Sequence, residues 1–197
     1  MKRIILLSGK QGAGKSTIAK HLVEDLLATG MLPKILKFAD PLYELHNACL
    51  PILKRLGIVP ISTVKEGSLL QVLGTEYGRE KISQDVWVKA ARRIADEFLN
   101  SKEFIKQKVV IIDDCRFQNE FAGFSDAFKV RLVAPRDARK LRCSGWRNDE
   151  KHISETDLDE FEKNNKFDLT ISTVQRTPQD VAKVVAHWAK EFWGQFI

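Results

Sequence analysis

The chain reads Gly9-Lys10-Gln11-Gly12-Ala13-Gly14-Lys15-Ser16-Thr17 close to its N-terminus, which is the spacing G-x-x-x-x-G-K-[ST]. Glycines at these places let successive backbone N–H groups converge on phosphate oxygens, at a helix N-terminus whose dipole favours anions. In such a loop the lysine reaches the β- and γ-phosphates and the hydroxyl after it binds Mg²⁺. The predicted phosphate-binding residues are Gly9, Gly12, Ala13, Gly14, Lys15, Ser16 and Thr17.

The sequence around this loop has the alternation of strand and helix that the loop requires. A buried apolar strand is predicted at residues 3–8, before the loop, and a helix with one apolar face at 15–28, after it. The unbroken apolar run of the 108–113 strand is typical of a central parallel strand. We therefore predict an α/β P-loop NTPase fold with a five-stranded, mainly parallel sheet flanked by helices. The other predicted strands lie at 34–39, 128–134 and 168–172.

Residues 42–99 have helical periodicity and contain no convincing strand. This segment is too long to be a single crossover connection between two strands. We predict a single domain over 1–197, with a core at 1–41 and 105–197 and an inserted helical subdomain at about 42–104. The final helix is predicted to begin at Pro178 with Thr177 as its N-cap. Its expected apolar face comprises Val181, Val184, Val185, Trp188 and Phe192.

Composition excludes several classes of protein. The 197 residues are 44% hydrophobic and 29% charged, which argues against collagen, coiled-coil and disordered chains. No apolar run approaches the roughly 20 residues that span a bilayer, and no signal-peptide cleavage region is evident. Three separated cysteines without a CxxC pair indicate neither a disulfide framework nor a zinc site. We expect a cytoplasmic protein without membrane contact.

The net charge of +6 favours phosphate-bearing partners, either nucleotides or nucleic acids. The positive charge is dispersed, and no run of five or six basic residues occurs. We therefore expect no stable nucleic-acid complex. A nucleic-acid-binding protein, with or without coupled ATP hydrolysis, stays as one alternative function.

Two classes of P-loop enzyme can be weighed against each other. A GTPase needs NKxD after a buried strand and a DxxG motif, but residues 165–168 match NKxD after a polar segment and no DxxG occurs. A kinase needs arginines that neutralise the transferring phosphoryl group. Four arginines occur after the 128–134 strand, where a lid at about 135–151 would close over ATP, although a solvated basic loop would look the same. These are Arg136, Arg139, Arg142 and Arg147.

Further short strings follow the loop in a fixed order. They are Phe38-Ala39-Asp40-Pro41, Gln71-Val72-Leu73-Gly74-Thr75-Glu76-Tyr77-Gly78-Arg79, Asp85-Val86-Trp87, Asp114-Cys115-Arg116-Phe117-Gln118-Asn119-Glu120 and His152-Ile153-Ser154-Glu155. Together with the loop, this order resembles the phage-type deoxynucleoside monophosphate kinases over residues 4–168. Each string is weak alone, and their common order is fairly specific.

The resemblance implies transfer of the ATP γ-phosphate to a deoxynucleoside 5′-monophosphate, with Mg²⁺, in a fold that is often dimeric. It also implies that the inserted helices bind the acceptor and that the location is the host cytoplasm if a phage encodes the chain. The residues carried over to the monophosphate pocket are Gln71, Gly74, Trp87 and Asp114.

The chemistry of individual residues extends this set. Asp40 and Asp114 follow strands, and ligands of open α/β sheets bind at the carboxyl ends of strands. Asp114 or Asp113 is suited to ordering Mg²⁺, and the family alignment favours Asp114. Arg79 and Arg116 are suited to gripping the acceptor phosphate with forked hydrogen bonds. We assign catalysis to Lys15, Arg116, Arg136, Arg139 and Arg142, the metal to Ser16 and Asp114, and the acceptor to Asp40, Gln71, Gly74, Arg79, Trp87, Asp114 and Arg116.

Structural alternatives stand beside several of these assignments. Trp87 between two valines is equally typical of a core aromatic residue. Arg79 has Glu76 and Glu80 within a helical turn, and Arg116 has Glu120 four residues on, so each arginine has a possible local ion-pair partner. His152 is expected to be structural, near a Ser154 cap.

Two departures from the family pattern affect recognition. Gly67 and Ser68 stand where family members often carry basic residues, and Ser172 and Thr173 stand where an asparagine often meets a purine. The sequence therefore leaves open another small acceptor for the same fold, such as dephospho-coenzyme A.

Overall fold

The computed structural model describes residues 2–102, 107–144, 146 and 151–194. The elements are β1 (Ile4–Ser8), α1 (Lys15–Ala28), β2 (Leu32–Leu36), α2 (Asp40–Arg55), α3 (Gly67–Gln71), the π-helix η1 (Val72–Ile82), α4 (Val86–Asn100), β3 (Lys108–Cys115), α5 (Gln118–Gly123), β4 (Phe128–Val133), α6 (Arg136–Leu141), α7 (Ile153–Thr156), α8 (Asp159–Lys163), β5 (Leu169–Ser172) and α9 (Pro178–Gly194).

The strands of the described residues form one five-stranded sheet in the order β2-β3-β1-β4-β5, and every neighbouring pair is parallel. The predicted α/β class and five-stranded parallel sheet are confirmed. Because β1 and β3 are central, the loops that follow them lie side by side at the carboxyl edge of the sheet, where ligands of such sheets bind.

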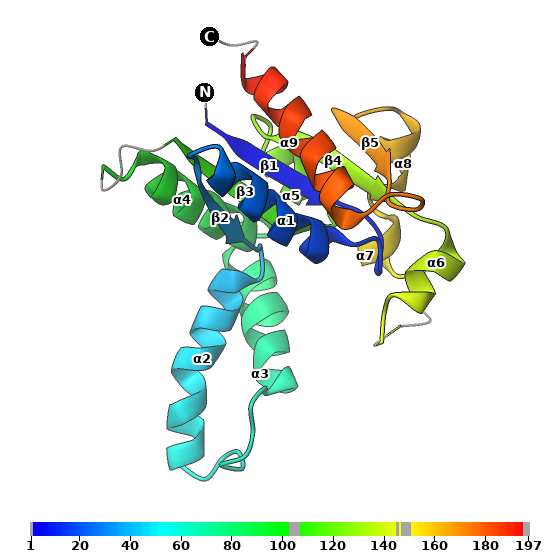
Figure 1. The fold of residues 1–197 in the computed structure, drawn as a ribbon. Helices are drawn as coiled ribbons and strands as arrows, with labels where there is room; N and C mark the ends of the chain where they lie inside the picture. The colour runs from blue at the N-terminus through cyan, green and yellow to red at the C-terminus, as the bar shows by residue number, and fades with distance from the viewer. Residues whose placement is uncertain (1, 103–106, 145, 147–150, 195–197) are drawn as a thin grey trace.

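Helices cover both faces of the sheet (Figure 1). On one face α1 and α9 pack on Ile5, Val109 and Ile111, and the buried side chains form one continuous apolar cluster. On the other face α4 and α5 pack on Val110 and Ile112. Alternate residues of β3 thus point into opposite cores, which is the period of two that every strand imposes.

The second strand differs from its predicted bounds. It spans Leu32–Leu36 rather than 34–39, and it includes Pro33, which pairs with Val109. Proline lacks an N–H donor, but β2 is the edge strand and has a free side. The strand ends because the N–H of Lys37 donates to the Asp40 carboxylate at 2.7 Å.

The inserted segment is helical, as predicted, and part of it leaves the body of the molecule. In Figure 1, α2 and α3 project away from the sheet, and we call residues 40–82 the arm. The helix that follows, α4, instead packs its Val88, Ala91 and Ala95 side chains into the core. The exact boundary between core and acceptor-binding insertion stays a prediction. No helix in the described ranges combines the length and apolar character needed to cross a membrane.

We predict that Gly123→Ala destabilises the protein, because an added Cβ would lie 2.2 Å from Cγ1 of Val88 on α4. Overpacking of this kind costs roughly 1–3 kcal/mol, and valine has little rotamer freedom to move away. Urea denaturation measures the loss. Gly67→Ala is the matched control with open space around the new methyl, so its stability should stay close to wild type.

The cause is tested by the double variant Val88→Ala/Gly123→Ala. If the clash is the reason, Gly123→Ala costs less in the Val88→Ala background than in the wild type. Purely additive losses would contradict this account of the α4–α5 contact.

Candidate functional site

The phosphate loop leaves β1 at Ser8 and runs into α1 at Lys15, as predicted. Its glycines take backbone conformations that other residues rarely adopt: Gly12 has φ +76° and Gly14 has φ +96°. At Gly12, a Cβ would lie 2.4 Å from the carbonyl oxygen of Arg139. Glycine is therefore needed here both for the turn and for the close approach of α6.

Lys15 is a buried cation at the first turn of α1. Its side-chain nitrogen donates to the carbonyl oxygens of Gly9 at 2.5 Å and Lys10 at 3.2 Å, and the residue is 8% exposed. Burial, together with the nearby positive charge of Arg116 and against the opposing effect of Glu155, lowers the pKa of Lys15 to about 8. Among the described residues it forms no ion pair, so an anion that enters the loop would relieve the cost of burying this charge.

Two consecutive aspartates end β3, and they point to opposite faces. Asp113 shares a face with Val109 and Ile111, which is the face that α1 covers. Asp114 points the other way, and its carboxylate accepts a hydrogen bond from the N–H of Phe38 at 3.0 Å. Burial raises the pKa of Asp114 to about 6. The alternation of the strand thus places Asp113 on the face that α1 covers and Asp114 on the other, while both residues border the cavity over the phosphate loop.

Asp113 has a buried oxygen without a hydrogen bond. Its Oδ1 accepts no hydrogen bond from the described residues and forms a long ion pair with Nζ of Lys37 at 3.8 Å. A buried carboxylate oxygen without a donor is costly unless something binds it.

A cavity of about 620 Å³ opens over the loop. It brings together many of the predicted residues, since it is lined by the phosphate loop, the end of β3, Arg116 and Arg142. Thr173, Arg176 and Pro178, which follow β5 in the chain, also line this cavity. Apart from Gly9, the residues predicted for ATP and metal therefore share one cavity with two of the predicted catalytic arginines.

Arg116 is fixed at its backbone and at its side chain. The carboxylate oxygen Oε2 of Glu120 accepts the N–H groups of both Arg116 and Phe117, at 2.7 and 3.0 Å. The guanidinium of Arg116 donates instead to Glu155 at 2.5 Å. The local Arg116–Glu120 side-chain ion pair, kept open as an alternative, is not formed. Burial raises the pKa of Glu120 to about 7.

The arginines after β4 have different surroundings. Arg139 is buried and donates to the carbonyl oxygens of Gln11 at 3.0 Å and Ala134 at 3.1 Å, so it supports the phosphate loop from below. Arg142 donates to both the hydroxyl and the carbonyl of Thr173, at 2.9 Å each. Arg136 lies on the surface in α6. Arg147 and part of the predicted lid fall outside the described residues.

Two of the residues predicted for the acceptor, Asp114 and Arg116, line the loop cavity, whereas Asp40, Gln71, Gly74, Arg79 and Trp87 lie outside its lining. Trp87 is 9% exposed, and its indole N–H donates to the carbonyl of Gly74 at 2.9 Å, which fastens η1 to α4. Gln71 is exposed at the end of α3. Asp40 accepts the Lys37 N–H described above. Base stacking on Trp87 stays a prediction, and the structure gives this side chain a packing role.

Arg79 lines a separate hollow of about 450 Å³. Its guanidinium lies 5.7 Å from the ring centroid of Phe117, and no ion pair to Glu76 or Glu80 occurs among the described residues. Phe117 lines this second hollow, while its chain neighbour Arg116 lines the loop cavity. Two consecutive residues of the chain thus line the two separate spaces.

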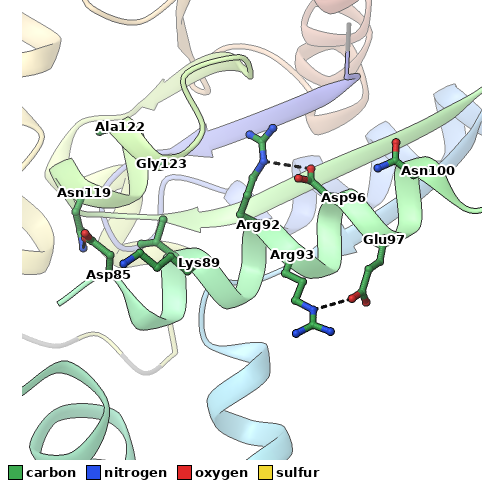
Figure 2. Close-up of a pocket in the computed structure, with 11 residues that line it drawn as sticks. Asp85, Lys89, Arg92, Arg93, Asp96, Glu97, Asn100, Asn119, Ala122 and Gly123 are labelled. Atoms are coloured by element: carbon green, nitrogen blue, oxygen red, sulfur yellow. Dashed lines mark hydrogen bonds and ion pairs between the residues drawn. The ribbon is translucent and has the colours of Figure 1, made fainter. Parts of the chain in front are cut away.

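A larger hollow of about 810 Å³ lies over the outer face of α4 (Figure 2). Its two arginines are already paired: Arg93 binds Glu97, and Arg92 binds Asp96 and also Asp126, which lies outside the lining. Its lining comes from α4, α5 and the turn before α4, so it holds neither the loop nor Lys15. The volume of this hollow is therefore not evidence that it is the reactive site.

Sequence reasoning missed the role of Glu155. The residue was part of the His152–Glu155 string, yet no chemistry was assigned to it. Its carboxylate accepts the N–H of Gln11 in the phosphate loop at 2.7 Å. His152 is structural, as expected, but the expected Ser154 cap is wrong: Ser154 lies inside α7, and the ring nitrogen of His152 caps this helix by accepting the N–H of Ser154 at 3.2 Å.

A parallel α/β sheet, a glycine-rich loop between β1 and α1, and a buried lysine at the helix start together define a P-loop NTPase fold. A family model described as an AAA domain matches residues 5–163, and the chain belongs to this family. No curated protein matches the chain significantly.

Solved structures share this fold at low sequence identity. TT1252 from Thermus thermophilus has a TM-score of 0.61 at 20% identity, covering 96% of this chain and 97% of that one. A shikimate kinase from Acinetobacter baumannii, solved with shikimate, has a TM-score of 0.52 at 16% identity, covering 97% and 94%. At these identities the likeness concerns the fold.

We predict that Glu120→Gln raises stability at pH 8 and leaves it nearly unchanged at pH 4.5. Both N–H bonds reach one carboxylate oxygen, which the amide oxygen of glutamine can replace. The folded-state pKa of about 7 lies above the ordinary 4.5, so the wild type loses stability as pH rises from about 4.5 to 7. The variant lacks this loss, and its advantage should grow to on the order of 1–3 kcal/mol.

Urea denaturation at several pH values measures this difference. Glu160→Gln, at an exposed position on α8, is the control and should follow the wild-type pH profile. A stability difference that does not change between pH 4.5 and 8 would show that the charge of Glu120 is not the cause.

Proposed function

We propose that this chain is a Mg²⁺-dependent kinase that transfers the γ-phosphoryl group of ATP to a deoxynucleoside 5′-monophosphate. The observation that carries the proposal is the arrangement around Arg116 and Phe117. One residue lines the phosphate-loop cavity and the next lines the Arg79 hollow. A donor in the first space and an anionic acceptor in the second would meet at Arg116.

The fold supports a small-molecule kinase in general, since one structural neighbour is titled a shikimate kinase. The deoxynucleotide acceptor rests on the ordered strings of the sequence. Arg79 suits a phosphate because its guanidinium is half-buried and planar, with five donors. A homodimer, implied by the same resemblance, stays a prediction.

The chain offers a fitting place for Mg²⁺. Ser16 carries its hydroxyl in the first turn of α1 and lines the loop cavity. The buried Oδ1 of Asp113 accepts no hydrogen bond from the described residues. Oxygen ligands of this kind are what Mg²⁺ prefers, with nucleotide phosphates and water completing its shell. We assign the metal to Ser16 and Asp113, with Asp114 bracing the turn at Phe38. When bound, the ion would offset charge on the β- and γ-phosphates.

The remaining steps follow from the residues of the chain. An oxygen of the acceptor phosphate attacks the γ-phosphorus, the bond from that phosphorus to the β–γ bridging oxygen breaks, and ADP leaves. Lys15 and the loop amides hold the donor phosphates, and Arg116 lies toward the acceptor. Positioning and charge neutralisation are most of what this reaction needs from a protein.

The function is tested with a panel of ribo- and deoxynucleoside monophosphates, together with an alcohol acceptor such as dephospho-coenzyme A. Product is measured as labelled diphosphate from labelled ATP. We expect transfer to at least one deoxynucleoside monophosphate. Lys15→Ala should lower turnover at least about 100-fold, because the removed charge stabilises the transferring group.

The matched control is Lys20→Ala, an exposed lysine on the same helix. The Lys15 variant should remain folded, since the lowered pKa shows that its charge costs folding free energy at pH 7. Transfer to the alcohol alone would replace the proposed acceptor. A salt-sensitive DNA shift without any transfer would favour the nucleic-acid alternative.

Neighbouring aspartates provide a second test. We predict that Asp113→Asn raises the Mg²⁺ concentration for half-maximal turnover at least about 10-fold, because a ligand of the ion or of its water is lost. Asp114→Asn should change this concentration less than about threefold, since its remaining oxygen can still accept the Phe38 N–H. Titrating Mg²⁺ at saturating ATP separates the two. If Asp114→Asn raised the required Mg²⁺ concentration more than Asp113→Asn does, the metal would be assigned to Asp114 instead.

A further inference from the structure

Glu155 lies on α7, directly after the predicted lid, and its carboxylate spans two parts of the site. Its Oε2 accepts the N–H of Gln11 at 2.7 Å, and its Oε1 accepts from Nη1 of Arg116 at 2.5 Å. The side chain of Glu155 is only 10% exposed. One carboxylate therefore joins the phosphate loop to the arginine at the end of β3.

The contact with Glu155 leaves other N–H donors of Arg116 available for a phosphate group. A guanidinium has five N–H donors, and within the described ranges the Arg116 guanidinium donates to the Glu155 carboxylate through one nitrogen. The Arg116 side chain is 33% exposed and lines the loop cavity. Donors that do not face Glu155 are thus available to a phosphate group in that cavity.

Other contacts already hold this segment to the body of the protein. Asp157 accepts the backbone N–H of Gln118 at 2.7 Å. Asp159 binds Lys10 at 2.8 Å and Arg131 at 2.9 Å. The α7–α8 region is therefore anchored on both sides of the loop without Glu155, whose two bonds go to the site itself.

We propose that Glu155 is a positioning residue that holds the guanidinium of Arg116 against the phosphate loop, so that it faces the transferring phosphoryl group. This inference rests on the proposed kinase function. A long arginine side chain has many rotamers, and fixing one of them removes an entropic cost from the transition state. Glu155 acts through Arg116 and does not itself touch the substrates.

The test is a double-mutant cycle with Glu155→Gln and Arg116→Ala. The glutamine keeps the shape and one acceptor but cannot accept both N–H groups as an ionised carboxylate does. We expect the kcat of Glu155→Gln to fall about 10-fold or more, with the KM for ATP changed less than about threefold. In the Arg116→Ala background the second substitution should cause no further loss.

Glu160→Gln is the matched control, since the Glu160 side chain on α8 is 67% exposed and pairs with its neighbour Lys163. Its kcat should equal that of the wild type. Glu155→Asp is a second variant, which keeps the charge but is one methylene too short to span both partners, and it should lose kcat as the glutamine does. Thermal unfolding of every variant checks that the fold is retained.

All proteins are also assayed for slow ADP release without any acceptor, where water takes the phosphoryl group. If no monophosphate is phosphorylated by the wild type, the proposed acceptor is wrong, and ADP release still tests Glu155 through the same cycle. Losses that multiply in the double variant, or a Glu155→Gln kcat within twofold of wild type, would overturn the positioning role. A wild type with neither activity would overturn both proposals.

Discussion

The structure of the site depends on one buried positive charge, the Lys15 ammonium group beside the backbone of the phosphate loop. Lys15 has carbonyl oxygens as partners and no ion pair among the described residues, and its pKa of about 8 records the cost of that burial. The loop can hold such a charge only if its own shape is enforced from outside. Arg139 supports it through the carbonyl of Gln11, and Glu155 through the N–H of the same residue. Residues far apart in the sequence thus converge on one peptide unit.

Much of this architecture could be predicted from the sequence because local rules govern it. The loop spacing, the apolar strands and the helix at 15–28 each follow from short-range patterns, and the structure reproduces them. The opposite orientations of Asp113 and Asp114 could also be predicted from the alternation of the strand, since Val109 and Asp113 share a face. Which of the two carboxylates binds the metal stays a proposal.

Other features could not be predicted because they depend on long-range packing. The apolar face of the last helix is rotated from the expected one: Trp188 is 51% exposed, whereas Trp193 is buried. Small alanines at 182, 186 and 189 occupy the contact with α1, and close packing there decides the rotation. The arginines after β4 read as lid residues, yet the roles of Arg139 and Arg142 depend on carbonyls in the loop and after β5. No spacing rule reports such partners.

The arm has a further consequence for how the chain can be altered. It departs from the body after β2 and returns at the start of α4, and both junctions are fastened, by Asp40 and Asp114 at one end and by the indole of Trp87 at the other. Neither α2 nor η1 contributes a strand to the sheet or a side chain to the loop cavity. A protein engineer could therefore exchange this segment for another of different length while the sheet and the phosphate loop keep their structure.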